Sequence, residues 1–150
     1  MAGVMFDKKI YEVRPGIRKS MRDLLDIGVD LGASDVHLVS GCPPRYRMGP
    51  DLLKYEEAAE LKDSRGHEPM SPVDPETAKR LIYSMFTTRK QLDRFKREQE
   101  FDLSAETEKA RFRVNVGVES RGPYSTIRII PYRGCVAISK SINTSFSSII

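Results

Sequence analysis

The sequence ARFRVNVGVESRGPYSTIRIIP, residues 110–131, contains two segments in which apolar and polar residues alternate. The first segment covers residues 110–119, and the second covers residues 124–131. A period of two residues is typical of a half-buried β-strand. The bend at Arg121-Gly122 contains a glycine, which supplies the positive φ that a tight turn needs. This stretch therefore predicts a β-hairpin.

A two-residue turn at Arg121-Gly122 would set the register of this hairpin. It would place Arg128 opposite Asn115, with Arg113 one diagonal away on the same face at roughly 7 Å. Two arginines at this separation repel each other unless an anion, an acidic neighbour or water separates them. The outer face is therefore a candidate anion-binding surface, although arginines are also ordinary on the solvent side of a hairpin.

Positive charge is concentrated in the same part of the chain. The 150 residues carry a net charge of +4, with 25 Lys and Arg against 21 Asp and Glu. Residues 109–133 hold six basic residues and one acidic residue, so this segment carries +5 and the remainder about −1. A localised positive face indicates phosphate, carboxylate or nucleic acid as the partner.

Length and composition predict one domain with its own core, since 39% of the residues are hydrophobic. No apolar run approaches the roughly 20 residues of a membrane helix, and the N-terminus lacks the plan of a signal peptide. We therefore expect a cytoplasmic protein. Cys42 and Cys135 are far apart and lack nearby ligand partners, so we expect free thiols and no metal site.

The order of elements predicts an α+β fold. A helix capped by Ser20 and ended by Gly32 is followed by strands at residues 33–39, 45–48 and 52–55, and residues 56–74 read as a surface loop. Two further helices, with caps at Asp74 and at Thr87 or Thr88, precede a strand at residues 101–104 and the hairpin. Strands that neighbour in sequence favour an antiparallel sheet with helices packed on one side.

Asp35 and His37 share the polar face of the predicted strand at residues 33–39. They could form a polar pair at a subunit boundary, or a structural histidine beside a carboxylate. The sequence places no Ser or Cys nucleophile next to them.

Three separated motifs carry a family resemblance. LGASDVHLVSGCPPRYRMG, TAKRLIYSMFTTRKQLDRFKREQEFDLS and ARFRVNVGVESRGPYSTIRIIP occur in that order, and the resemblance that they carry covers about Met21 to Pro131. This chain resembles the N-terminal domain of PilT-like type IV pilus retraction ATPases, within the wider type II/IV secretion ATPase family. The resemblance implies a PAS-like domain at residues 20–133, after a leader at residues 1–19, that works with a RecA-like motor domain in a hexameric ring.

The resemblance also implies roles for particular residues. Arg113 in RFRVN and Arg128 in TIRIIP match arginines that the family's N-terminal domain lends to nucleotide bound by the motor domain, and Arg121 matches a further basic position. Asp35 and His37 fall in the family's ASD-x-H motif, and with Arg47 they are expected at an interface between domains or subunits. The full-length family enzymes use ATP and Mg²⁺, and this chain alone is expected to bind neither tightly.

The sequence departs from the family in the turn Arg47-Met48-Gly49-Pro50, where the family usually has an acidic residue followed by glycine, and in two further respects. A motor needs a phosphate-cradling G-x-x-x-x-G-K-[ST] loop and an acidic metal-binding strand, and the 150 residues contain neither. We therefore expect no ATP hydrolysis by this chain alone. Residues 134–150, GCVAISKSINTSFSSII, do not resemble the linker into a motor domain, and we expect a truncated, poorly packed tail.

The resemblance implies a function in twitching motility or in secretion. The sequence does not distinguish between the two. The expected partners are the motor domain, neighbouring subunits and an inner-membrane pilus or secretion platform, which would hold the protein at the membrane periphery. Two alternatives remain: a basic hairpin carrying Tyr124 that binds single-stranded nucleic acid, or a PAS-like small-molecule sensor. Nucleic acid is the less favoured partner because the arginine face has few aromatic residues.

Overall fold

The computed structural model describes residues 6–132. The leader residues 1–5, the tail 134–150 and Cys135 lie outside the described residues. Within the described part, the main element is a six-stranded antiparallel sheet in the order β5-β4-β3-β8-β7-β6. Its strands are β3 (Asp35–Val39), β4 (Arg45–Met48), β5 (Asp51–Lys54), β6 (Glu100–Glu106), β7 (Ala110–Glu119) and β8 (Gly122–Pro131). The predicted α+β class with an antiparallel sheet is confirmed.

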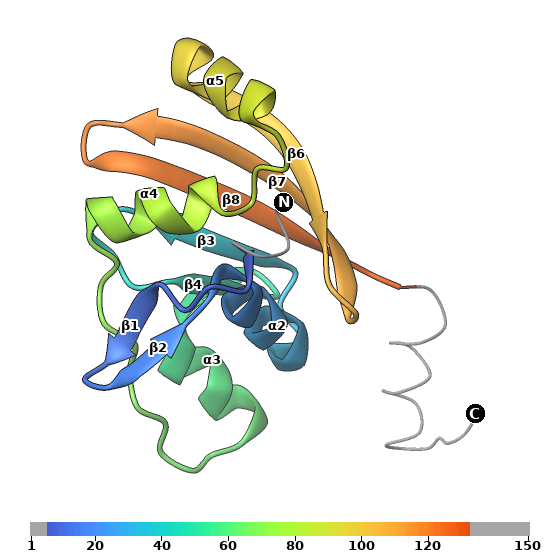
Figure 1. The fold of residues 1–150 in the computed structure, drawn as a ribbon. Coiled ribbons are helices and arrows are strands. Elements are labelled where there is room, and N and C mark those ends of the chain that lie inside the picture. Colours follow the sequence, from blue (N-terminus) through green and yellow to red (C-terminus); the bar gives the residue numbers. More distant parts are fainter. Residues whose placement is uncertain (1–5, 133–150) are drawn as a thin grey trace.

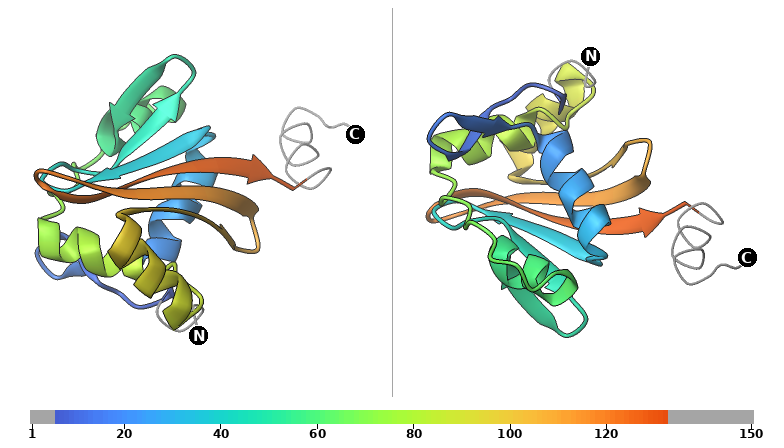
Figure 2. Two further views of the ribbon diagram at one scale, coloured as in Figure 1. Left: turned by 90° about the horizontal axis from the view of Figure 1, so that it is seen from above. Right: turned by 90° about the horizontal axis from the view of Figure 1, so that it is seen from below.

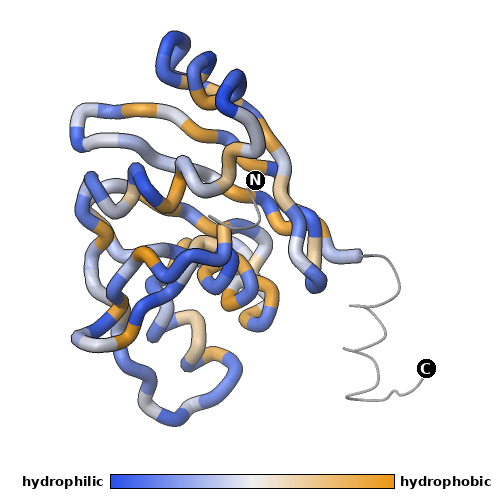
Figure 3. Tube along the Cα trace, in the orientation of Figure 1, coloured by the Kyte–Doolittle hydropathy of each residue, from blue (hydrophilic) through white to orange (hydrophobic). Residues whose placement is uncertain are grey.

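Four helices of the described region pack on one side of this sheet (Figures 1 and 2). They are α2 (Met21–Leu31), α3 (Tyr55–Lys62), α4 (Pro75–Tyr83) and α5 (Arg89–Glu98). Helix α3 packs beside α2, where Lys62 Nζ donates to the Asp30 carbonyl at 2.7 Å. Figure 3 shows that α5 and the loop after α3 are mostly hydrophilic, whereas hydrophobic residues are spread along the strands and α2. The other face of the central strands is left without a covering helix.

The helix boundaries follow the predicted capping signals. The Ser20 hydroxyl accepts from Asp23 N at 3.0 Å, and the Asp23 carboxylate accepts from Ser20 N at 2.8 Å, which completes a capping box. Gly32 ends α2 at φ +80°. Asp74 caps α4, and Thr88 caps α5. These caps satisfy backbone groups that would otherwise lack partners. Because few residue types can do this, the helix ends can be predicted from the sequence.

Two segments differ from the expected organisation. The stretch 56–74 was predicted as loop, but α3 occupies residues up to Lys62, because Ala58 and Ala59 are buried against the core. Residues of the expected leader form a separate hairpin, β1 (Tyr11–Arg14) and β2 (Ile17–Lys19), in which Tyr11 and Val13 are buried. No described helix is both long and apolar enough to cross a membrane.

The central hairpin forms as predicted, but its register differs. Glu119 pairs with Gly122, so the turn is Ser120-Arg121 rather than Arg121-Gly122. Gly122 has φ +132° and begins β8, where an added Cβ would lie 2.8 Å from Ser40 Oγ. Gly122 is therefore needed for its backbone angle and for close packing beside the turn, and the predicted pairing of Arg128 with Asn115 was wrong.

The core face of the hairpin follows the apolar alternation as far as Val116, whereas Val118, the last apolar residue of that alternation, is exposed. The side chains that β7 and β8 turn toward the helices are buried, namely Ala110, Phe112, Val114, Val116, Ile127 and Ile129. They join one hydrophobic cluster with residues of α2, α4 and β3. The alternate residues therefore point to the uncovered face of the sheet.

Candidate anion-binding site

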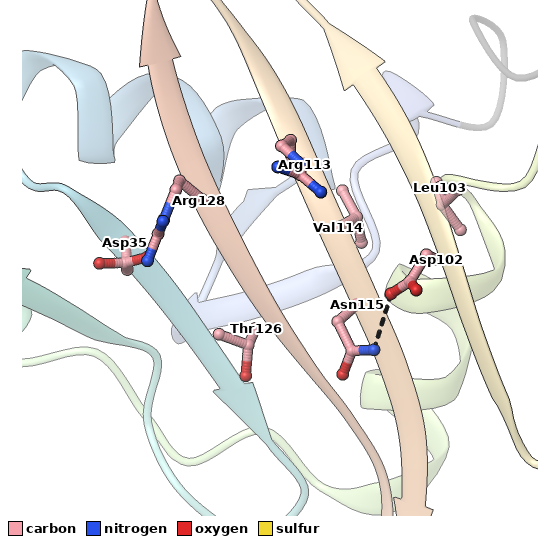
Figure 4. A pocket seen from close by; sticks show the side chains of 8 residues that line it. All are labelled: Asp35, Asp102, Leu103, Arg113, Val114, Asn115, Thr126 and Arg128. Atoms are coloured by element: carbon pink, nitrogen blue, oxygen red, sulfur yellow. Dashed lines mark hydrogen bonds and ion pairs between the residues drawn. The ribbon is translucent and has the colours of Figure 1, made fainter.

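A row of four charged residues crosses the uncovered face of the sheet on adjacent strands. Asp35 on β3 pairs with Arg47 on β4 and with Arg128 on β8. Arg128 in turn pairs with Arg113 on β7. We call Arg47, Asp35, Arg128 and Arg113 the arginine row; Figure 4 shows three of its members.

The alternation of each strand fixes these side chains on one face. Val36 and Leu38 of β3 are fully buried on the helix side, so Asp35 and His37 lie on the opposite side. Arg128 lies between the buried Ile127 and Ile129 for the same reason. The core pattern of β3 and β8 therefore places Asp35 and Arg128 on the uncovered face.

Asp35 is shared by two arginines. Its Oδ1 lies 3.5 Å from Arg128 Nε, and its Oδ2 lies 3.8 Å from Arg47 Nε. The Ser34 hydroxyl also donates to Oδ2 at 2.8 Å. Asp35 is 8% exposed, and a charge buried to this degree requires such partners. One carboxylate thus faces two guanidinium groups.

Arg113 adds a further positive charge to the row. Its side chain is exposed, and among residues 6–132 it makes no ion pair. It stands directly across from Arg128, an arrangement of like charges that destabilises a sheet. The arginine row therefore has three positive charges and one negative charge, and an anion between Arg113 and Arg128 would relieve the repulsion.

A second row of polar residues lies beside the first. His37, Thr126, Asn115 and Asp102 follow one another across β3, β8, β7 and β6. Asn115 Nδ2 donates to Asp102 Oδ1 at 2.8 Å, as Figure 4 shows. With Asp35, Arg113 and Arg128, three of these residues (Thr126, Asn115 and Asp102) line an open depression of about 310 Å³. The depression combines guanidinium donors with amide, hydroxyl and carboxylate groups.

His37 contributes an uncharged group to this face at neutral pH. Partial burial, followed by the nearby Arg47 charge, lowers the pKa of His37 below its ordinary 6.5, and Asp35 only partly opposes this. The imidazole is therefore a neutral hydrogen-bonding group and adds no charge to the arginine row.

Five of the six predicted site residues come together: Arg47, Asp35, His37, Arg113 and Arg128. Arg121 does not join them, because it lies in the hairpin turn at the end of β7 and β8. There it lies 3.5 Å from the Glu119 carboxylate, and its Nη1 is 3.7 Å from the free thiol of Cys42.

The sequence interpretation missed three members of the depression, Thr126, Asn115 and Asp102. The alternation of the hairpin already placed Asn115 and Thr126 on the arginine face, so that signal was present. Asp102 could have been found from Phe101 and Leu103, which flank it as the inward residues of β6.

The Tyr124 ring packs against the backbone of the opposite strand of the hairpin. It pairs with Gly117 across the strands, and its ring leaves no room for a Cβ on that glycine. One face of the ring is therefore occupied by backbone. Among residues 6–132, no cluster of three or more His, Cys, Asp or Glu residues could hold a metal ion.

Comparison with known proteins gives two kinds of match. No protein-family model matches the chain. The type IV pilus retraction ATPase PilT of Pseudomonas aeruginosa PAO1 is 31% identical over 110 residues, which are 73% of this chain and 28% of that protein.

Solved structures match over the same share of the chain. The crystal structure of the pilus retraction motor PilT with bound ADP matches with a TM-score of 0.55 and 27% identity, over 73% of this chain and 28% of that chain. The ATPase DotB of Legionella pneumophila matches with a TM-score of 0.53 and 20% identity, over 74% and 28% respectively, and supports the fold alone. The chain thus spans a little over a quarter of the length of the relatives that it matches.

Proposed function

Since this chain is a homologue of the N-terminal region of PilT-like ATPases, in the type II/IV secretion ATPase family, we propose that it supplies phosphate-binding arginines to a nucleotide held by a RecA-like motor domain. The arginines are Arg113 and Arg128. The nucleotide is ATP, with Mg²⁺, and the motor domain provides the phosphate-cradling loop that the 150 residues lack.

The observation that carries this proposal is the direct pairing of Arg113 with Arg128 on an uncovered sheet face. Arginine remains charged at any physiological pH and can bind two phosphate oxygens through its planar guanidinium group. Arg113 has no acidic partner among the described residues, and Arg128 is 70% exposed. Both groups are therefore available to a ligand that approaches from outside.

The chemistry expected of these residues is electrostatic. Charge develops on the γ-phosphate oxygens during phosphoryl transfer, and positioned guanidinium groups stabilise that charge. Because the arginines and the phosphate-cradling loop come from different domains, the site is complete only when the domains close. Because the arginines would contact the γ-phosphate only while it is present, their positions on the sheet would change with the state of the nucleotide.

The proposal extends to the assembly. We place this PAS-like domain in a hexameric ring of ATPase subunits in the cytoplasm, where it acts with an inner-membrane pilus or secretion platform. Asp35, His37 and Arg47 lie next to the proposed phosphate contact, so they would face the motor domain or a neighbouring subunit.

The test uses the purified chain together with the motor domain of Pseudomonas aeruginosa PilT, expressed without its own N-terminal region. We expect the chain to stimulate ATP hydrolysis by this motor domain, and the Arg113→Ala, Arg128→Ala double variant to lose the stimulation. The matched control is the Arg45→Ala, Arg111→Ala double variant, which removes two exposed charges from the same face outside the arginine row.

The control variant should stimulate as the unmodified chain does. Equal stimulation by both double variants, or no stimulation by the unmodified chain, would reject the proposal.

A further inference from the structure

Asp35 is the only Asp or Glu that is buried among residues 6–132. Every other Asp or Glu of that region is at least partly exposed. A buried carboxylate is costly unless it is paired and hydrogen-bonded. Asp35 lies between two arginines beside the proposed phosphate site, so we looked to these arginines for its function.

The two arginines that share Asp35 are held differently. The Arg47 side chain is 35% exposed, and its Nη1 also donates to the Pro50 carbonyl at 3.4 Å. The Arg128 side chain is 70% exposed, and Asp35 is its ion-pair partner among the described residues. Arg47 is therefore the fixed partner of the carboxylate, and Arg128 is the partner that can leave.

The contacts also use different oxygens. Arg128 is next to Oδ1, whereas Arg47 and the Ser34 hydroxyl are both next to Oδ2. When Arg128 turns away, Oδ2 keeps both of its partners. Release of Arg128 therefore leaves Asp35 with a cation and a hydrogen bond.

We propose that Asp35 is an internal competitor for phosphate: it holds Arg128 while the site is empty and gives it up when a phosphate group binds between Arg128 and Arg113. The inference rests on the proposed function only for the identity of the ligand as a phosphate. Asp35 is thus a positioning residue that sets the affinity of the site, and the exchange of Arg128 links phosphate occupancy to β3 and β4.

This role predicts an effect opposite to that of an ordinary binding residue. Asp35→Asn keeps the shape of the side chain and can still accept from Ser34, but it removes the charge that holds Arg128. Triphosphate should therefore bind several-fold more tightly to Asp35→Asn than to the unmodified chain. Arg47→Gln should weaken binding more than Arg45→Gln does, because Asp35 then depends on Arg128 alone.

The experiment is a titration of the whole chain with inorganic triphosphate, followed by NMR of the arginine Nε–H groups. It needs neither nucleotide nor a motor domain. Glu100→Gln is the matched control, since it removes an exposed carboxylate from the same face of β6 that lies outside the depression and pairs with Gly117 rather than with an arginine. In free Asp35→Asn, the Nε–H signal of Arg128 should already have moved from its position in the unmodified chain.

A double-mutant cycle separates competition from general charge repulsion. In an Arg128→Gln background, Asp35→Asn should no longer tighten binding. Unchanged affinity in Asp35→Asn, a gain that persists without Arg128, or no triphosphate binding by any folded variant would overturn the inference. If Asp35→Asn does not fold, the comparison of Arg47→Gln with Arg45→Gln decides, and equal effects reject the role.

The two proposals fail separately. Tighter triphosphate binding by Asp35→Asn without stimulation of a motor domain would leave the role of Asp35 intact and reject the role in ATP hydrolysis. Stimulation of the motor domain that depends on Arg113 and Arg128 but not on Asp35 would support the role in ATP hydrolysis and reject the role of Asp35.

Discussion

Arg113 on β7 stands directly opposite Arg128 on β8, and no acidic residue of the described chain pairs with Arg113. Residues at directly opposed positions on one sheet face have Cβ atoms roughly 5 Å apart. A sheet selected for stability alone would not place two guanidinium groups there. The pairing therefore predicts a conflict between stability and ligand binding that can be measured.

Replacing Arg113 with threonine should stabilise the protein. Threonine favours β-strands, and the substitution removes the cross-strand repulsion, so we expect a gain of about 0.2–1 kcal/mol in the free energy of unfolding. Urea denaturation at low ionic strength is the measurement, because salt would screen the repulsion. Arg111→Thr is the control for strand propensity: Arg111 is exposed on the same face but pairs with Ile130 and Glu106, so its replacement relieves no repulsion and should give a smaller gain than Arg113→Thr. A loss of stability in Arg113→Thr would contradict the interpretation.

His37 should make stability depend on pH. Its folded-state pKa is lowered, so the unfolded chain binds a proton more readily as the pH falls through its ordinary value of 6.5. The stability that neutral His37 contributes is therefore fully present above pH 6.5 and is lost as the pH falls toward the folded-state pKa. For one proton, the free energy of unfolding changes by at most about 1.4 kcal/mol per pH unit in this range.

The measurement is urea denaturation at about pH 7.5 and about pH 5.5, above the range in which most carboxylates titrate. His37→Gln should lose part of the difference between the two stabilities, whereas His67→Gln, which retains His37, should keep it. The same difference in all three proteins would show that His37 has no part in it.

The N-cap of α2 should contribute measurably to stability. Ser20 is buried and forms a reciprocal capping box with Asp23, which also accepts from Lys9 Nζ at 2.6 Å. Ser20→Ala removes the oxygen that accepts from Asp23 N, so we expect a loss of about 1 kcal/mol, within the range 0.5–2 kcal/mol for such caps. Thermal denaturation would measure it, with the exposed Ser64→Ala as a neutral control. Equal melting temperatures would argue against the cap.

Local signals in the sequence were sufficient for most elements of the fold. Two kinds of signal depend only on residues close together in the sequence: the helix caps at Ser20, Asp74 and Thr88, and the alternation in β7 and β8. Both can therefore be predicted without knowledge of the fold. Helix α3 was missed because its buried face consists of Ala58 and Ala59, which give a weak periodic signal among charged residues.

The register and the site required information that is not local. The turn was predicted one residue too late, because a glycine is required either at a central turn position or where another residue approaches closely. Gly122 is required because Ser40 approaches it closely, and the sequence alone does not show that contact. Arg113 and Arg128 could be paired approximately from the hairpin alone. Asp35 could not be placed between Arg47 and Arg128, because that position depends on the order β4-β3-β8 in the sheet.

Gly28 should be intolerant of the smallest substitution, although it lies within a helix. Alanine is normally favoured over glycine there by about 1 kcal/mol. An added Cβ at Gly28 would lie 2.9 Å from Val36 Cγ2 and 3.1 Å from Ile129 Cδ1, both in the packed core between α2 and the sheet. We therefore expect overpacking to dominate, with a net loss of about 1–3 kcal/mol in Gly28→Ala.

The control for this substitution is Gly66→Ala, whose Cβ would meet no atom within 4 Å and which should leave stability nearly unchanged. Val36 and Ile129 adjoin Asp35 and Arg128 in sequence, so a shift of α2 away from the sheet would also displace the arginine row. NMR spectra of Gly28→Ala should then show changed signals for Asp35 and Arg128 on the far face of the sheet. A stabilised Gly28→Ala with unchanged signals would mean that α2 can move without disturbing the site, and that close packing at Gly28 does not hold the row in place.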